Sequence, residues 1–196
     1  MSTGPDLYLA SRSPRRAELL QQIGLHYQVL LPDVQEQPQA NESASSYVQR
    51  LAKEKAQAGW QLLENLPKHP VLGADTVVVL DDDILEKPRD REQALQMLER
   101  LSGRSHQVMT GMALVAGEQS DVRVSISQVS FRATTVAERE AYWASGEPMD
   151  KAGGYGVQGL AAAFVERIDG SYSGIMGLSL FELTEMLSHY RINVFK

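Results

Sequence analysis

The sequence predicts an α/β fold in which the strands form a mixed β-sheet. Segments with helical periodicity alternate with short apolar segments typical of strands. Residues 106–115 and 122–134 both have strand character and follow each other with no helix between them, so a purely parallel sheet is not expected. With 196 residues the chain is long enough for one well-buried core. We expect a single domain over residues 1–196. This domain can consist of two lobes around an active-site cleft.

The first part of the chain contains three expected strands and two expected helices. The strands are expected at Leu7–Ala10, Tyr27–Leu31 and Val71–Leu80. The first helix follows Ser13, a favourable N-cap residue, with Pro14 at its first position, and continues to about Gly24. The second helix spans residues 45–66 and follows a polar loop. Its buried face is predicted from apolar residues at helical spacing, namely Val48, Leu51, Ala52 and Leu62.

The second part of the chain continues the alternation. Asp81–Asp83 is expected to form an acidic turn into a short strand at residues 84–86. Further helices are expected at 89–101, 136–145 and 178–190. The two long strands at 106–115 and 122–134 are expected to pair, and a last strand is expected at 162–168, after a glycine-rich segment at 151–159.

Composition and charge exclude several classes of function. The net charge of −6 argues against broad nucleic-acid binding, which needs a basic face, but allows a small anionic ligand held by a few local cations. The chain has no cysteine, which excludes disulfide frameworks, thiolate metal sites and cysteine nucleophiles. No apolar run is long enough to span a bilayer, and the N-terminal residues lack the pattern of a signal peptide. We therefore expect a cytoplasmic protein that binds a small molecule, with neither nucleic acid nor membrane as partner.

The segment Ser11–Arg16, between the first strand and the first helix, indicates an anion site. Backbone N–H groups at the start of a helix favour an anion. Arg15 and Arg16 lie in the first turn, where the helix dipole disfavours cations by roughly 0.3–1 kcal/mol each. The presence of two arginines at this unfavourable position is explained if a phosphate neutralises them, because the guanidinium group binds phosphate oxygens in a bidentate way. Two solvated arginines on a surface helix are the alternative.

Two lysines are candidates for further positive charge. Lys55 shares the apolar stripe of the second helix, since it follows Leu51 by four residues and Val48 by seven. A lysine on such a stripe needs an anion or must extend its stem toward solvent, and both explanations stay open. Lys87 directly precedes Pro88, a position at which a lysine is usually just exposed.

Asp75 interrupts the apolar strand and is the best candidate for an acid or a base. A buried carboxylate is costly unless it is paired or binds a metal. At the end of a strand it can accept a proton from an attacking water or help to hold Mg²⁺, and capping of the following turn is the structural alternative. Glu36, in the polar loop, is on its own explained as a solvated residue. Asp75 and the basic residues together provide what phosphoryl chemistry requires, with no nucleophilic side chain.

Several stretches, taken in order, resemble the Maf family of nucleotide pyrophosphatases over nearly the whole chain. They are LASRSPRR, RLAKEKA, GADTVV, EKP, LSGRSHQVMTG, SGEPMDKAGGYGVQG and GSYSGIMGL. The resemblance implies an elongated mixed sheet with helices packed around a central cleft, similar to the inosine-triphosphate pyrophosphatases. It also implies hydrolysis of a nucleotide between its α- and β-phosphates with a divalent cation, Mg²⁺ or Mn²⁺. A homodimer is compatible with the family.

The resemblance also implies roles for individual residues. Asp75 would be the proton acceptor. Glu36, with Asp75, would hold the metal or the water. The expected phosphate contacts are Ser11, Arg15, Arg16, Lys55 and Lys87, of which the two lysines would be catalytic.

Three positions track the choice of substrate within the family: Arg15, Thr76 and Gln158. They resemble the branch that hydrolyses dTTP and UTP, whereas the 7-methyl-GTP branch has Trp, Gln and Glu there. An amide can donate to and accept from the imide edge of thymine or uracil. The resemblance thus implies a house-cleaning enzyme for dTTP, UTP and modified pyrimidine nucleotides. The alternatives are the same reaction on 7-methyl-GTP or other non-standard nucleotides, and a nucleotide-binding regulator of septum formation.

Overall fold

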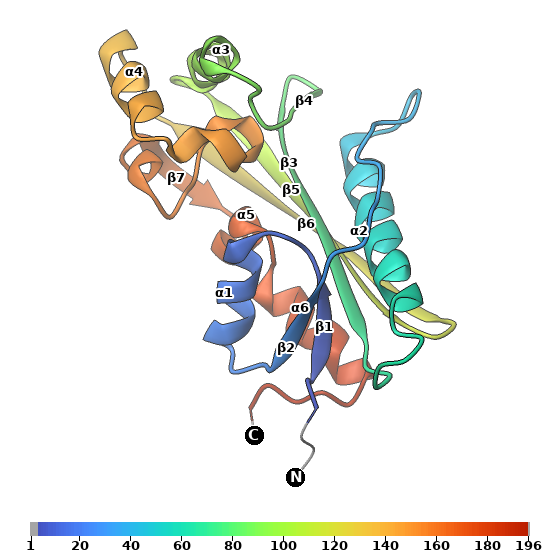
Figure 1. Cartoon of the computed structure of the whole chain (residues 1–196). Coiled ribbons are helices and arrows are strands. Elements are labelled where there is room, and N and C mark those ends of the chain that lie inside the picture. Colours follow the sequence, from blue (N-terminus) through green and yellow to red (C-terminus); the bar gives the residue numbers. More distant parts are fainter. Residues whose placement is uncertain (1–3, 196) are drawn as a thin grey trace. The chain divides into compact units, whose positions relative to one another are not determined.

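The computed structural model describes residues 4–195, which separate into two compact units. The first unit contains the chain up to Asp75, Thr110–Ser125 and the chain from Gly177 onward, and the second contains Thr76–Met109 and Ile126–Met176. Three of the four crossings between units fall within strands: β3 (Val71–Leu80), β5 (Ser105–Ala116) and β6 (Gln119–Phe131). Figure 1 follows the chain in colour from one end to the other. No helix within residues 4–195 combines the length and the apolar character needed to cross a membrane.

The strands form a mixed sheet, which confirms the predicted α/β class. Their order is β2-β1-β3-β5-β6-β7, with β4 paired to β3. In the first unit, β1 (Leu7–Ala10) is parallel both to β2 (Tyr27–Leu30) and to β3. In the second unit, β4 (Asp83–Leu85) is antiparallel to β3, and β7 (Val165–Asp169) is antiparallel to β6. Parallel and antiparallel pairs therefore occur in the same sheet.

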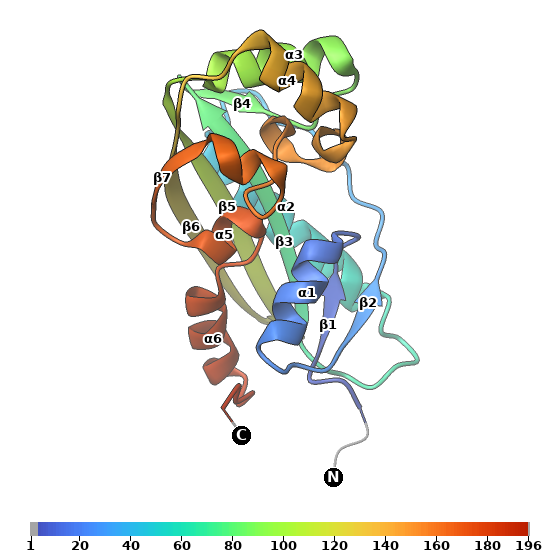
Figure 2. The same cartoon turned by 90° about the vertical axis from the view of Figure 1, so that its left-hand side faces the viewer.

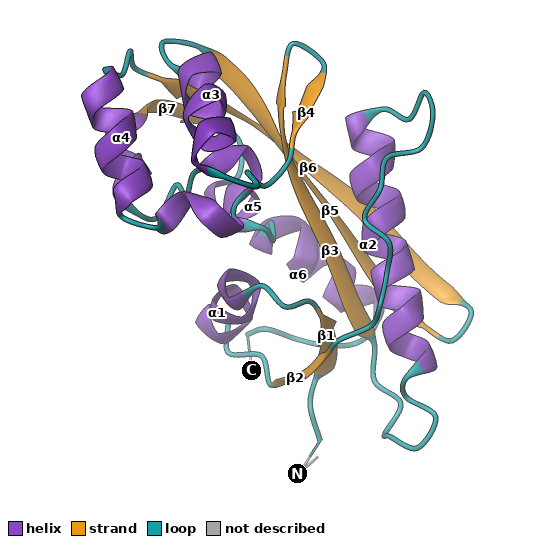
Figure 3. Ribbon diagram, turned by 45° about the horizontal axis from the view of Figure 1, so that its top comes forward, coloured by secondary structure: helices purple, strands orange, loops and turns teal. Residues whose placement is uncertain are grey.

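Helix α2 (Ala44–Gln61) is the longest helix of the first unit, which also contains α1 (Pro14–Gln22) and α6 (Leu180–His189). Ser43 caps α2, because its side chain accepts a hydrogen bond from the backbone N–H of Ser46 at 3.1 Å. Figures 1 and 3 show α2 running along the sheet. A Cβ atom added at Gly73 of β3 would lie 2.2 Å from the carbonyl oxygen of Ala52. Glycine therefore lets the helix backbone rest directly on the strand.

The predicted end of α2 and one of its predicted core residues were wrong. The helix stops at Gln61, five residues before the predicted end at Leu66, because the chain tightens there: the N–H of Leu62 bonds to the carbonyl of Gly59 at 3.1 Å. Leu62 is consequently 51% exposed, while Leu63 is fully buried and packs with Tyr8 and Val71. Helical periodicity cannot be extended past the point where the helix ends.

The second unit combines strands with several helices. Its α-helices are α3 (Arg91–Leu101), α4 (Val136–Ala144) and α5 (Tyr172–Met176). α3 and α4 lie side by side at one end of the unit, as Figure 2 shows. Four aromatic rings fill the core between them and the strands: Phe131, Tyr142, Tyr155 and Phe164.

Several boundaries in this unit differ from the sequence predictions. Residues 160–164 form a 3₁₀ helix, so β7 begins at Val165 and not at residue 162. β6 runs from Gln119 to Phe131, where the prediction placed it at 122–134. The short helices at 147–150, 152–154 and α5 were not predicted, because segments of three to five residues have too few turns to show periodicity.

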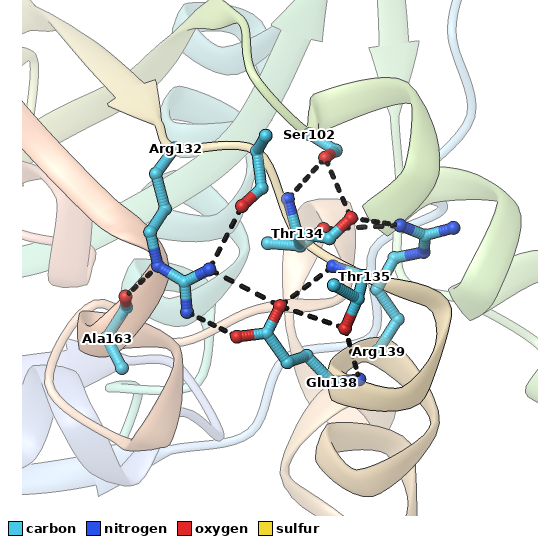
Figure 4. A network of polar contacts seen from close by, with 8 residues as sticks. Ser102, Arg132, Thr134, Thr135, Glu138, Arg139 and Ala163 are labelled. Carbon is cyan, nitrogen blue, oxygen red and sulfur yellow. Dashed lines mark hydrogen bonds and ion pairs between the residues drawn. The ribbon is translucent and has the colours of Figure 1, made fainter.

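A polar network fixes the start of α4 (Figure 4). Thr135 and Glu138 form a capping box, in which each side chain bonds to the backbone N–H of the other residue. The guanidinium group of Arg132 donates to Glu138 at 2.7 Å and to the carbonyl of Ala163 at 2.9 Å. The hydrogen bond from Arg132 lowers the pKa of Glu138 to about 2. Ser102 completes the network by accepting from the N–H of Thr134 at 2.7 Å, so α4 is tied to the end of α3.

Candidate active site

Lys55 is the centre of the charged cluster in the first unit. Its ammonium nitrogen lies 2.6 Å from Oε1 of Glu36 and 2.7 Å from Oδ1 of Asp75. The side chains of Lys55 and Asp75 are each only 11% exposed, whereas Glu36 is 46% exposed. Lys55 is therefore paired with anions, which excludes the alternative that its stem merely extends to solvent. The structure also brings Glu36, which residue type alone left as a solvated loop residue, into the same cluster.

The position of Asp75 follows from strand alternation. Successive side chains of a strand point to opposite faces, so Val71, Gly73 and Asp75 share one face of β3. Gly73 contacts the α2 backbone at Ala52 and Ala56, which fixes this face against the helix. Asp75, two residues further, meets Lys55 of the same helix. The glycine in the GADT segment therefore sets the approach that brings the two charged residues together.

The loop that carries Glu36 is held by Arg50 of α2. The guanidinium group of Arg50 donates to both carboxylate oxygens of Glu42 at 2.7 Å, to Glu54 at 3.2 Å and to the backbone carbonyl of Gln37 at 3.0 Å. These hydrogen bonds, that of Glu42 above all, raise the pKa of Arg50. Because Gln37 directly follows Glu36, Arg50 fixes the backbone next to the carboxylate. Sequence alone does not predict this role of Arg50, since its spacing to Glu54 indicates only a surface ion pair on a helix.

Arg16, in the first turn of α1, is buried and hydrogen-bonded to Gly177 and to Ser11. Its Nε donates to the carbonyl of Gly177 at 3.1 Å, and its Nη1 donates to Oγ of Ser11 at 3.0 Å. Burial lowers the pKa of Arg16, the Asp75 carboxylate raises it, and the neighbouring Arg15 lowers it. Arg16 thus lies within electrostatic reach of Asp75, and the alternative of a solvated surface arginine does not apply to it.

The start of α1 matches the predicted junction in all but one respect. Pro14 occupies the first turn, Arg15 and Arg16 follow, and no acidic residue lies in that turn. Ser13 is the N-cap residue, but its side chain accepts no capping hydrogen bond. Its own N–H donates instead to Oγ of Ser11 at 3.2 Å. Ser11 therefore connects the strand end, the helix start and Arg16 through one hydroxyl group.

The remaining predicted residues belong to the second unit. Lys87 and Gln158 are both exposed, and Thr76, the first residue of this unit, is half-buried directly after Asp75. The segments of Lys87 and Gln158 contact each other: the N–H of Gly153 donates to the carbonyl of Glu86 at 3.1 Å. The structure thus gathers the predicted residues into two groups, one in each unit.

Curated relatives cover nearly the whole chain. A protein of Alkalilimnicola ehrlichii named dTTP/UTP pyrophosphatase is 53% identical over 192 residues, which cover 96% of this chain and 95% of the relative. A protein of Salmonella typhimurium with the same name is 51% identical over 185 residues, which cover 94% of this chain and 92% of the relative.

Among solved structures, the Ham1 protein of Staphylococcus aureus matches with a TM-score of 0.46 at 14% identity, over 64% of this chain and 71% of that one. The sequence model described as Maf-like protein matches residues 6–190. Since this match covers more than half of the chain, the protein belongs to the Maf-like family.

Proposed function

We propose that the protein hydrolyses dTTP and UTP to the nucleoside monophosphate and pyrophosphate. Relatives that are 50–53% identical over more than nine tenths of the chain are named dTTP/UTP pyrophosphatases. The observation that carries the proposal is the buried contact between Lys55 and Asp75, with Arg16 in electrostatic reach. A carboxylate among cations is what the attack of water on a polyphosphate requires.

Asp75 acts as the general base of this reaction. Lys55 contacts Oδ1, so the proton of the attacking water is transferred to Oδ2. Asp75 is fixed by its strand and by Lys55, and a base that does not have to reorient can hold a water in line with the bond to be broken. The Lys55 ammonium also offsets negative charge that develops on the phosphate oxygens during the attack.

The phosphate groups bind at the start of α1. Arg15, Arg16 and Lys55 carry three positive charges in the first unit against the two carboxylates of Glu36 and Asp75, which leaves the cluster positive. The helix start adds the partial positive charge of its backbone N–H groups. Ser11 orients Arg16 through its hydroxyl group.

The donor set also fits a divalent cation. Mg²⁺ usually binds to proteins through one or two carboxylates and completes its shell with waters and substrate phosphates. Glu36 and Asp75 provide two carboxylates, each of which pairs through one oxygen with the Lys55 ammonium and has a second oxygen to offer the ion. These two residues would hold the ion, and Mg²⁺ or Mn²⁺ would supply neutralisation of the polyphosphate charge.

Because dTTP and UTP are cytoplasmic metabolites, the activity belongs to the cytoplasm.

Substrate choice depends on Arg15, Thr76 and Gln158. Gln158 is exposed on its loop, as a side chain that contacts a base must be. Its amide pairs with the imide edge of uracil or thymine, whereas a glutamate would only accept hydrogen bonds. The proposed preference is therefore for pyrimidines with an intact imide, including modified ones.

Product analysis tests the proposed reaction directly. The purified protein is incubated with UTP and Mg²⁺, and the products are separated by ion-exchange chromatography. Formation of UMP and pyrophosphate supports the proposal, whereas UDP and orthophosphate would contradict it. Values of kcat/KM for UTP, dTTP and 7-methyl-GTP then test the substrate assignment, and a preference for 7-methyl-GTP would overturn it.

A further inference from the structure

The loop that carries Gln158 is attached at one end to the Glu147 carboxylate and at the other to the Tyr142 hydroxyl group, which itself bonds to that carboxylate. The N–H of Leu160 donates to Oε2 of Glu147 at 2.9 Å. The hydroxyl group of Tyr142 donates to Oε1 of Glu147 at 2.7 Å and accepts from the N–H of Gly156 at 3.1 Å. Gly156 and Leu160 lie two residues before and two residues after Gln158. The Tyr142–Glu147 pair thus fixes the backbone on both sides of the glutamine.

Two glycines allow the loop to lie directly on this pair. A Cβ atom at Gly159 would lie 2.3 Å from either carboxylate oxygen of Glu147. A Cβ atom at Gly156 would lie 2.8 Å from Cε of Lys151, whose ammonium group donates to the backbone carbonyl of Glu147 at 2.7 Å. A side chain at Gly159 would displace the Glu147 carboxylate from its place against the loop, and one at Gly156 would displace the Lys151 side chain. The glycines of this segment are therefore explained by close packing.

The pair itself is rigidly placed. Tyr142 is 3% exposed, and burial together with the nearby Glu147 carboxylate raises its pKa, so its hydroxyl stays protonated and can donate. Tyr142 follows Glu138 by one helical turn on α4, and the network of Figure 4 anchors Glu138. Val157 is buried in the core while Gln158 is exposed, so the fixed backbone also decides which side chain points outward.

We propose that Tyr142 and Glu147 are positioning residues for base selection: they hold Gln158 in the conformation that reads the imide edge of uracil and thymine. This inference rests on the proposed function and deepens it. Neither residue touches the base itself. Their effect is expected on discrimination between bases more than on the rate of the chemical step.

The test compares UTP with CTP, because cytosine replaces the imide edge by an amine and a bare ring nitrogen. We expect Tyr142→Phe to lower the UTP-to-CTP ratio of kcat/KM by about tenfold, mainly through a higher KM for UTP. Gln158→Ala should lower the ratio to a similar extent. The double variant should resemble Gln158→Ala alone, because residues that act through one another are not additive.

Glu147→Gln provides a second, milder variant, since glutamine has one acceptor oxygen where the carboxylate has two. It should also lower the ratio, and the amide hydrogens of Gly156 and Leu160 should exchange faster with solvent. Glu140→Gln is the matched control: Glu140 lies on the same helix, pairs with Arg91 and, among the described residues, forms no hydrogen bond or ion pair with the loop. It should leave the ratio unchanged.

An unchanged ratio in Tyr142→Phe and Glu147→Gln, with a lowered ratio in Gln158→Ala, would overturn the inference. Full additivity in the double variant would overturn it as well, and so would an unchanged ratio in Gln158→Ala. If the unmodified protein fails to produce UMP and pyrophosphate from UTP, the proposed function fails, and the inference fails with it. The products that the unmodified protein forms from UTP therefore distinguish a failure of the proposed function from a failure of this inference alone.

Discussion

The ammonium group of Lys55 lies 2.7 Å from Oδ1 of Asp75, although the two residues are 20 positions apart in the sequence. The two side chains are equally buried, and Lys55 is shared between the carboxylates of Asp75 and Glu36. Removing one partner of such a pair leaves an uncompensated buried charge, which costs more than the pair itself contributes. Turnover and stability therefore depend on the same contact, so both have to be measured for each variant of these residues.

Asp75→Asn should abolish turnover without abolishing nucleotide binding. Asparagine keeps the shape of the side chain but cannot accept the proton of the attacking water, so we expect kcat to fall by about 10²–10⁴-fold. The dissociation constant for UTP, measured by calorimetry, should change only a few-fold because the arginines remain. Asp83→Asn, at an exposed ion pair with Arg100, is the control. Unchanged turnover in Asp75→Asn would remove Asp75 from the mechanism.

Lys55→Met should destabilise the protein, while Lys53→Met should not. The first change leaves the Asp75 and Glu36 carboxylates without their shared cation and should lower the unfolding free energy by up to about 3 kcal/mol. Lys53, on the exposed face of the same helix, should change it by less than about 0.5 kcal/mol. Urea denaturation measures both values. Equal effects of the two substitutions would contradict a buried role for Lys55.

The residues of this cluster differ in how far sequence could predict them. Asp75 and Lys55 stood out because each breaks an apolar pattern, and the structure shows that they pair. Glu36 has no such pattern around it, and only the family resemblance pointed to it. Arg50, Tyr142 and Glu147 were missed because their roles consist of contacts between segments distant in sequence, which periodicity does not describe.

The same limit applies to the fold. Elements such as β3 and α3 were predicted closely, because the apolar residues that define their patterns are buried along the element. At the end of α2 the chain tightens locally, although the apolar pattern in the sequence continues. As a result Leu63 is buried in the core, where the pattern had predicted Leu62. The 3₁₀ segment at 160–164 likewise replaced the predicted start of a strand.

Leu63→Ala and Leu62→Ala should therefore differ strongly in stability. Leu63 is fully buried against Tyr8 and Val71, and its truncation should cost about 2–5 kcal/mol of unfolding free energy. Leu62 is half-exposed, and its truncation should cost less than about 1 kcal/mol. Thermal or urea unfolding of the two variants measures the difference. A larger loss in Leu62→Ala would mean that α2 continues beyond Gln61.

Arg50→Lys should weaken catalysis without unfolding the protein. Lysine keeps the charge but cannot contact Glu42, Glu54 and the carbonyl of Gln37 at once, so the loop of Glu36 loses its anchor. We expect kcat/KM for UTP to fall by about tenfold, with an increased requirement for Mg²⁺. Arg100→Lys, at the exposed ion pair with Asp83, should leave both unchanged. A normal Mg²⁺ requirement in Arg50→Lys would show that this anchor does not act on Glu36.

His106 should make the stability of the protein fall in mild acid. It is buried, its Nε2 lies 2.7 Å from the hydroxyl group of Tyr155, and its ring packs against Phe131. Burial lowers its pKa from 6.5 to about 4. Between these values the unfolded chain binds a proton that the folded protein does not, so stability is fully present above about pH 6.5 and declines as the pH falls toward 4.

The full decline corresponds to roughly 3 kcal/mol for a pKa shift of this size. Urea denaturation at about pH 7.5, 6 and 5 should reveal it, and His106→Gln should flatten the dependence because glutamine does not titrate. His26→Gln, at a histidine whose side chain is 81% exposed, should leave the slope unchanged. If His106→Gln retains the slope of the unmodified protein, the acid sensitivity arises elsewhere, from carboxylates that lose their partners when they are protonated.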